Sequence, residues 1–328
     1  MIQPAARREW PSHQLSSFHK REAERREELR CILIKRYGLA VLWLLPVGVL
    51  AISSASILIR LTPADPVAIT LWRLAFATFI VLAAGAVKGL ELPRGRDLAF
   101  SLLSGVFLAV HFLSWIPSLF LTTVAASTTL VNIHPIVMLF LSKALGERIN
   151  KTTAAGVLAA TAGALLITFS PGGLLGNLLA IVGAFSFAGY LAAGRVVRSS
   201  VGTLGYVAVA YGAAALVSLG VGLALRTNLT DYDPYTFFMF LLIASIPMMM
   251  GHTVFNYLLG RYRAVTIAAS TLGEPIGATL LAVPILGEVP TGTVTLGAGV
   301  ALPLQAIGIA ATLLGLFVVI REEIKASM

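Results

Sequence analysis

The apolar residues of this chain come in blocks of about twenty, the length that a helix needs to cross the ~30 Å hydrocarbon core of a bilayer. Only 12% of the 328 residues are charged, whereas about a quarter of the residues of a soluble domain usually are. The blocks lack the alternation of about ten residues that a membrane β-barrel requires. The sequence therefore predicts an all-α polytopic membrane protein, with the lipid bilayer as its surroundings.

Charged and Gly/Pro-rich breaks separate ten expected transmembrane helices. Their expected limits are 38–59, 67–87, 98–117, 123–142, 153–170, 174–194, 203–225, 236–258, 264–286 and 302–320.

The net charge of +9 is explained by topology and does not require a nucleic-acid partner. With the N-terminus in the cytoplasm, all but three of the 24 Lys and Arg residues fall on the cytoplasmic side, as the positive-inside rule demands. Arg60 and Arg226 lie on the opposite side. Arg73 lies near the start of the second expected span, where we expect a structural side chain that extends to the outer interface. The alternative is that Arg73 attracts an anionic substrate.

Residues 1–37 form a basic cytoplasmic extension that is rich in Arg, Lys and Glu. Either a membrane-surface helix or a disordered tail fits this composition. The extension lacks the apolar centre of a signal peptide, so we expect it to be retained. Cys31 is the only cysteine, which excludes an intrachain disulfide and a Cys-based metal cluster. No cofactor is expected.

The second half of the chain repeats features of the first half about 141 positions later. The Leu-Gly-Glu motif at 145–147 recurs at 286–288, and His111 corresponds to His252. Because each half has an odd number of expected spans, the second half would enter the membrane in the inverted orientation. Inverted repeats of this kind are a transporter architecture, in which two halves move about a site near the bilayer midplane.

Two further sets of residues concern helix packing and helix ends. Glu147 and Glu288 follow a glycine at the end of a span, which predicts helix caps or gate contacts. Small residues predict close helix packing in the fifth and tenth spans. These residues are Gly156, Gly163, Gly308 and Gly315.

Together these features resemble the EamA-type branch of the drug/metabolite transporter superfamily. The resemblance covers roughly residues 38–320 and rests on three features besides the five-plus-five arrangement. They are a Pro about twelve or thirteen residues before each Gly-Glu, Glu274-Pro275 in the ninth span and Tyr190 in the sixth. The chain departs from the family in its long loop between the ninth and tenth spans and in His134, where many members carry Ser or Thr.

The resemblance implies two five-helix repeats, 38–170 and 174–320, followed by a cytoplasmic tail, 321–328. It also implies a carrier in the plasma membrane with both termini in the cytoplasm, often an exporter of amino acids or other metabolites.

Glu274 is the first candidate for a residue that binds substrate or protons. An ionisable side chain at the bilayer centre costs at least about 2.5 kcal/mol on insertion scales. Pro275 cannot donate a backbone hydrogen bond and frees the carbonyl of Thr271, which predicts a kink. A carboxyl group and a carbonyl on one face could hold a substrate amine or a proton. The alternative is a protonated structural Glu that is hydrogen-bonded to a neighbouring helix.

His111 and His252 are each followed, one helical turn later, by a polar or aromatic partner, Trp115 and Asn256. Under twofold symmetry the two stripes would face each other across a cavity suited to an aromatic or zwitterionic ligand. Histidine can also carry protons near neutral pH. A histidine that binds a backbone carbonyl and fixes helix packing is the alternative. The remaining candidate substrate-binding residues are His134 and Tyr190. A metal site made of the three histidines is disfavoured, because they lie on different helices.

A secondary-active carrier of amino acids or related metabolites is therefore the leading hypothesis, with protons as a candidate coupling ion. A carrier of phosphorylated sugars or nucleotide sugars would need several Lys or Arg in its cavity, and Arg73 is the one candidate. A membrane-embedded enzyme would need a nucleophile with a base or a metal motif, and the sequence has neither. A passive channel would show a ring of repeated polar side chains, and the sequence has no such repeat. Both a monomer and a homodimer fit the sequence.

Overall fold

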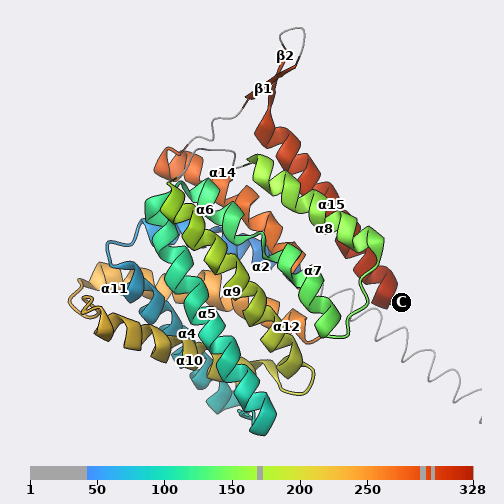
Figure 1. Ribbon diagram of the computed structural model, residues 1–328. Helices are drawn as coiled ribbons and strands as arrows, with labels where there is room; N and C mark the ends of the chain where they lie inside the picture. The colour runs from blue at the N-terminus through green and yellow to red at the C-terminus, as the bar shows by residue number, and fades with distance from the viewer. Residues whose placement is uncertain (1–42, 168–172, 289–292, 297–299, 328) are drawn as a thin grey trace, which may run out of the picture. The chain divides into compact units, whose positions relative to one another are not determined.

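The computed structural model describes residues 43–167, 173–288, 293–296 and 300–327. The basic extension at 1–37 and the expected insertion near 291–301 therefore lie wholly or partly outside the described residues. Residues Leu44–Ala326 form one unit, and this unit is a bundle of packed helices with one short β-hairpin (Figure 1).

The elements in chain order are α2 (Leu44–Ser53), α3 (Ala55–Arg60), α4 (Pro66–Lys88), α5 (Gly95–Leu121), α6 (Val124–Val131), α7 (His134–Ala144), α8 (Lys151–Ile167), α9 (Leu174–Arg198), α10 (Thr203–Ala224), α11 (Pro234–Ile243), η1 (Ala244–His252), α12 (Thr253–Leu259), α13 (Ala264–Ser270), η2 (Thr271–Gly273), α14 (Glu274–Leu286), β1 (Thr293–Leu296), β2 (Val300–Pro303) and α15 (Leu304–Ser327).

Seven of the described helical segments are long and apolar enough to cross a membrane. They are Pro66–Lys88, Gly95–Leu121, Val124–Ala144, Leu174–Arg198, Thr203–Ala224, Pro234–Leu259 and Ala264–Leu286. Leu44–Arg60 and α8 are shorter apolar helices, and α15 overlaps the tenth expected span. The prediction of a polytopic helical membrane protein is therefore confirmed.

The prediction of an all-α chain needs one correction. In the loop between the ninth and tenth expected spans, β1 and β2 pair in antiparallel register, with Thr293 opposite Pro303. The strand sequence Thr-Val-Thr-Leu is rich in β-branched residues, which favour extended backbone. The spans were predicted from blocks of about twenty apolar residues. Strands of only 4 residues are too short to be detected in this way.

Two helices begin with the same kind of cap. The Asp65 side chain accepts a hydrogen bond of 2.8 Å from the backbone N–H of Val67, and Pro66 opens α4. At the start of α11, Asp233 accepts one of 2.9 Å from the backbone N–H of Thr236. A carboxylate at the N-cap satisfies an otherwise unpaired N–H, and a proline in the first turn loses no helical hydrogen bond. These caps set where α4 and α11 begin.

Two of the spanning segments are broken near their middle. The segment Val124–Ala144 is interrupted between α6 and α7, and Ala264–Leu286 changes to a 3₁₀ turn, η2, between α13 and α14. Pro135 and Pro275 each lie in the first turn of the second piece, where the missing N–H is tolerated. The helix is therefore interrupted where a kink was predicted at Pro275. The prediction that the carbonyl of Thr271 is free is wrong, because it accepts a hydrogen bond from the backbone N–H of Glu274 in the 3₁₀ turn. The two broken segments run antiparallel, with α6 against α14 and α7 against α13.

A π-helical segment, η1, follows α11 and contains Pro247. Proline removes a hydrogen-bond donor from the α-helical pattern, and π-helical turns often occur at functional sites. The segment packs against α2 and α4.

Helices α8 and α15 lie side by side (Figure 1) at very short range. A Cβ atom on Gly163 would lie 2.5 Å from the backbone nitrogen of Thr312, and one on Gly315 would lie 2.5 Å from the carbonyl oxygen of Gly156. Only glycine allows two backbones to approach so closely. The predicted close packing of these small residues is confirmed.

The expectation that Arg73 extends to the outer interface is wrong. Its side chain is fully buried, with 0% exposed. Arg73 lies two turns inside α4, on the face that also carries Ile69 and Ala77, both of which are fully buried. Because this face packs against the bundle, the side chain points into protein and cannot reach the interface.

Candidate functional site

The breaks in the two antiparallel segments enclose a cavity. It contains about 340 Å³ of space free of protein atoms, of which the centre of a water molecule could occupy about 20 Å³. A volume of that size admits roughly one water, so a larger ligand requires the lining helices to separate. The cavity is lined by Ile52, Ala55, His111, Trp115, Val131, Asn132, His134, Phe187, His252, Thr271 and Glu274. Five of the seven residues proposed from the sequence are among them.

The two breaks contact each other through polar side chains. Asn132 donates a hydrogen bond of 3.0 Å from Nδ2 to Oε2 of Glu274. His134 lies with its Nε2 3.1 Å from Oγ1 of Thr271 and its Nδ1 3.0 Å from the carbonyl oxygen of Val131. The break in each segment is therefore joined to the break in the other segment by two side-chain contacts, Asn132 to Glu274 and His134 to Thr271. Asn132 was not proposed as a site residue, although a polar Asn two positions before His134-Pro135 was a signal for it. Thr271 was proposed only for its backbone carbonyl, whereas here its side chain makes the contact.

The histidines of the cavity differ in their partners. His111 Nδ1 lies 3.0 Å from the carbonyl oxygen of Gly183, which can only accept a hydrogen bond. The rings of His111 and His252 lie 6.4 Å apart, centre to centre. Neither Nδ1 of His252 nor the indole N–H of Trp115 has a hydrogen-bond partner in the described part of the chain. The cavity thus holds polar groups that the surrounding protein leaves unpaired.

Asn256 and Tyr190 form a separate polar cluster next to this cavity. Asn256 Nδ2 donates to Oη of Tyr190 at 2.5 Å and to Oη of Tyr211 at 3.1 Å. Tyr211 Oη also lies 3.0 Å from Oγ1 of Thr253. The Tyr190 ring lies 5.5 Å from that of Phe187, which lines the cavity. The structure therefore places these two predicted residues beside the cavity wall.

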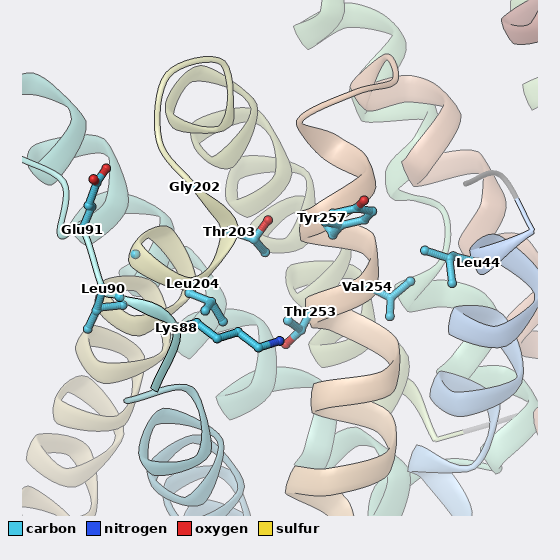
Figure 2. A pocket seen from close by; sticks show the side chains of 12 residues that line it. Leu44, Lys88, Leu90, Glu91, Gly202, Thr203, Leu204, Thr253, Val254 and Tyr257 are labelled. Carbon is cyan, nitrogen blue, oxygen red and sulfur yellow. The ribbon is translucent and has the colours of Figure 1, made fainter. Parts of the chain in front are cut away.

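A larger, more open cleft lies where α4 ends and α10 begins, and the centre of a water molecule could occupy about 890 Å³ of it, compared with about 20 Å³ in the cavity. Figure 2 shows the side chain of Lys88 extending across it toward Thr253. Since Thr253 also contacts Tyr211, the polar cluster connects this cleft with the wall of the cavity. The cleft is lined by Leu44, Lys88, Gly89, Leu90, Glu91, Gly202, Thr203, Leu204, Gly205, Thr253, Val254 and Tyr257.

One end of the broken segments is held by Glu147. Its carboxylate accepts hydrogen bonds of 2.9 and 3.1 Å from the backbone N–H of Ala264, the first residue of α13. The same carboxylate pairs with Nε of Arg195 at 3.0 Å, and Arg195 donates to the carbonyl oxygen of Leu259 at 2.6 Å. We call these residues the Glu147 cluster.

The opposite end is held by Glu288 with the same kinds of contacts. Its carboxylate accepts a hydrogen bond of 2.8 Å from the backbone N–H of Val124, the first residue of α6. It pairs with Nη1 of Arg60 at 3.0 Å, and Arg60 donates to the carbonyl oxygen of Leu119 at 2.8 Å. We call these residues the Glu288 cluster. The predicted role of both glutamates as caps agrees with these contacts.

In both clusters a left-handed glycine turns the glutamate toward its partner helix. Gly146 has φ 72° and Gly287 has φ 69°, a conformation that side chains with a Cβ rarely adopt. A carboxylate at a helix N-terminus is favoured by the helix dipole and by the unpaired N–H groups.

The described residues offer no group of three or more His, Cys, Asp or Glu side chains that could hold a metal ion.

Comparisons with known proteins place the chain in a family. The model described as "EamA-like transporter family" matches twice, at residues 38–169 and 174–321. No curated protein matches the chain. A solved structure titled only "Crystal structure of protein" superimposes with a TM-score of 0.69 and covers 87% of this chain and 98% of its own. At 19% identity, this likeness shows a shared fold.

Proposed function

The chain belongs to the EamA-like transporter family, and from that premise we propose that it is a secondary-active carrier of small metabolites. It exposes a site near the bilayer midplane alternately to the two sides of the membrane. The site is the cavity between the two broken helices, where polar side chains and interrupted backbone meet, as in other carriers with discontinuous helices. The chain has no proposed enzymatic role.

The observation that carries this proposal is the pair of matching clusters at opposite ends of the broken segments. Each consists of a glutamate after a left-handed glycine, the first N–H of the other broken helix, and an arginine. A carrier needs two gates of similar strength, one on each side, that open in turn. A glutamate that releases the helix it caps would let that helix move away from the cavity.

The same correspondence supports an inverted repeat of two five-helix units, 38–170 and 174–320, and ten membrane spans. The two successive matches to one family model agree with it. We propose a plasma-membrane location with both termini in the cytoplasm, the basic segment 1–37 preceding the repeats and the tail 321–328 following them. The Glu147 cluster and the cleft beside Lys88 then face the cytoplasm, and the Glu288 cluster faces the outside.

Amino acids or related compounds are the proposed substrates, in export or exchange, with protons as the coupling ion. We propose Glu274, His111 and His252 as the residues that bind or carry the proton. The aromatic and histidine side chains around the cavity suit a small organic ligand. Phosphorylated sugars remain the alternative, and they have less support because Arg73 is the one buried Lys or Arg beside the cavity in the described part of the chain.

The test is counterflow in proteoliposomes. Purified protein is reconstituted into vesicles loaded with an unlabelled member of an amino-acid panel, and entry of the labelled member is followed with and without a pH gradient. A carrier gives a saturable, transient accumulation above equilibrium, which a channel cannot produce. A flux that rises linearly with substrate concentration, without saturation, would indicate a channel and contradict the carrier function.

Absence of counterflow for every amino acid would remove the amino-acid proposal, and the same assay would then be run with sugar phosphates. Vesicles of the same lipid composition without protein are the control for leakage.

A further inference from the structure

Arg73 is a buried cation without an acidic partner. Its guanidinium Cζ lies 3.9 Å from the centre of the Phe112 ring, and its Nη2 lies 3.7 Å from the sulfur of Met248. Nε and Nη1 have no acceptor among the described residues, and no carboxylate of that part of the chain forms an ion pair with it. A thioether sulfur is a weak acceptor, and an aromatic face satisfies charge without satisfying N–H groups.

Such a group is costly to bury. An unpaired charge in a medium of low polarity loses its hydration and gains little in return. A sequence could avoid the cost with methionine or leucine at this position. This free-energy cost is offset if a ligand supplies acceptors and a negative charge to the guanidinium.

Two other ring nitrogens without hydrogen-bond partners lie around the same aromatic ring. The ring of Phe112 lies 5.3 Å from that of His252 and 6.3 Å from that of Trp115, centre to centre. Both side chains line the cavity, and both have an unpaired ring nitrogen. The N–H groups of Arg73 and the indole N–H of Trp115 are therefore buried donors without acceptors around Phe112. Nδ1 of His252 joins them in the tautomer that carries the proton there, and a group rich in acceptor oxygens would satisfy these donors together.

We propose that Arg73 is the carboxylate-binding residue of the transport site, with Trp115 and His252 as supporting donors. The inference rests on the proposed carrier function and names the substrate class, which is a compact acid with one carboxylate. A planar guanidinium matches the two oxygens of a carboxylate. A dianionic phosphate would leave one charge unmatched, because Arg73 is the single cationic side chain in this group.

The position of Glu274 completes the assignment. Its carboxylate interacts electrostatically with Arg73 and accepts a hydrogen bond from Asn132, which also lines the cavity. A cation binder that lines the cavity and an anion binder beside it fit a zwitterion, with the carboxylate at Arg73 and the ammonium at Glu274. Amino acids have this charge pattern.

The segment η1 contacts Arg73 and also contributes to the cavity lining. This π-helical segment carries Met248, which contacts Arg73, and His252, which lines the cavity. A shift of one residue in hydrogen-bond register within η1 would move both side chains together. Opening at this segment would bring Arg73 into the cavity when a substrate enters.

The test compares ligands that differ only in the carboxylate. The melting temperature of the purified full-length protein is measured with phenylalanine, phenylalanine amide and 3-phenylpropionate, and with the corresponding leucine set. We expect the acids to raise the melting temperature of the wild-type protein and the amides to have no effect. An equal rise with an amide, or no rise with any acid, would overturn the inference.

Arg73→Met tests the residue itself. Because it removes an unpaired buried charge, the ligand-free variant should melt at the same temperature as the wild type or higher, and its response to acids should be lost. The matched control is Arg96→Met, which removes an exposed arginine over Phe100 at 5.4 Å and should leave the response unchanged. If the melting temperature of Arg73→Met still rises with acids, Arg73 has only a packing role.

Arg73→Lys covers the case in which Arg73→Met fails to fold. It keeps the charge and loses the planar fork, so we expect folded protein with acid affinity reduced at least about tenfold. Unchanged affinity would contradict the proposal. Binding of acids without counterflow would support the carboxylate site and contradict the carrier function. Counterflow of amines alone would support the carrier function and contradict the carboxylate site.

Discussion

Asn132 donates a hydrogen bond of 3.0 Å to Glu274 across 142 positions of the chain. The contact joins two broken helices at the level of their breaks, and it gives the buried carboxyl group of Glu274 a neutral partner. A neutral partner holds the group in place without neutralising it, which leaves Glu274 able to exchange a proton or bind an amine.

Replacing Glu274 with Gln should therefore reduce transport without loss of folded protein. The amide keeps the shape and can still accept a hydrogen bond from Asn132, but it carries no charge and cannot titrate. We expect counterflow to fall at least roughly tenfold, the size of a lost charge-assisted interaction, and any effect of a pH gradient to disappear. Glu322→Gln, on the C-terminal helix, is the control that should transport normally. Normal flux in Glu274→Gln would remove the proton-binding role.

Exchanging the charges of Glu147 and Arg195 should fail to restore function. If the two residues formed only an ion pair, exchanging them would keep the attraction between the charges. Glu147, however, also caps the N-terminus of α13 by accepting a hydrogen bond from the backbone N–H of Ala264. A cation there would oppose the helix dipole. Both single charge reversals and the exchange should lower counterflow similarly. The control is exchange of Glu322 and Lys325, a pair three residues apart on α15 in which the side chain of Lys325 is 51% exposed and that of Glu322 is 10% exposed. Recovery in the exchanged Glu147 variant would show that the pair acts through charge alone.

Removing the charge should cost more stability at Glu147 than at Glu288. The side chain of Glu147 is 6% exposed and that of Glu288 is 23% exposed. Water weakens the more exposed cluster, so we expect Glu147→Gln to lower the free energy of unfolding by about 2 kcal/mol and Glu288→Gln by about 1 kcal/mol. Chemical denaturation of the purified proteins in detergent measures the difference. Equal losses would show that burial does not set the strength of the two clusters.

Changing His111 and His252 together should alter the range of substrates. Their rings lie 6.4 Å apart across the cavity, and Gln at both positions would keep polar groups while removing two aromatic surfaces. We expect the order of preference among aromatic and aliphatic amino acids to change in a competition assay. The single variants serve as controls, and an unchanged order in the double variant would assign both residues to helix packing.

Gly163→Ala should destabilise the protein, although the change adds only one methyl group. The new Cβ would lie 2.5 Å from the backbone of Thr312, and α8 and α15 would have to separate. Overpacking of this kind costs typically 1–3 kcal/mol. Gly220→Ala is the matched control, because a Cβ there meets nothing within 4 Å and alanine favours a helix. Equal melting temperatures for the two variants would contradict the close packing of α8 on α15.

Much of the architecture could be predicted because it depends on local properties of the chain. Apolar block length predicted the helices, and proline predicted the break at Glu274, since each effect acts within one helix. The glycines at 146 and 287 predicted where helices end. Cavity residues such as His111 and Glu274 could be proposed from the cost of polar groups in lipid.

What only the tertiary structure decided is which of these groups find partners. Arg73 looked like an interfacial residue from its place in the sequence, and the packing of α4 placed it in the interior. Asn256 resembled Trp115 by its spacing after a histidine, and contact with Tyr190 placed it outside the cavity. The contacts of Glu147 and Glu288 join helices more than 100 positions apart. The sequence determines which groups need a partner, whereas packing decides which are paired, because pairing depends on distances between helices that no local pattern encodes.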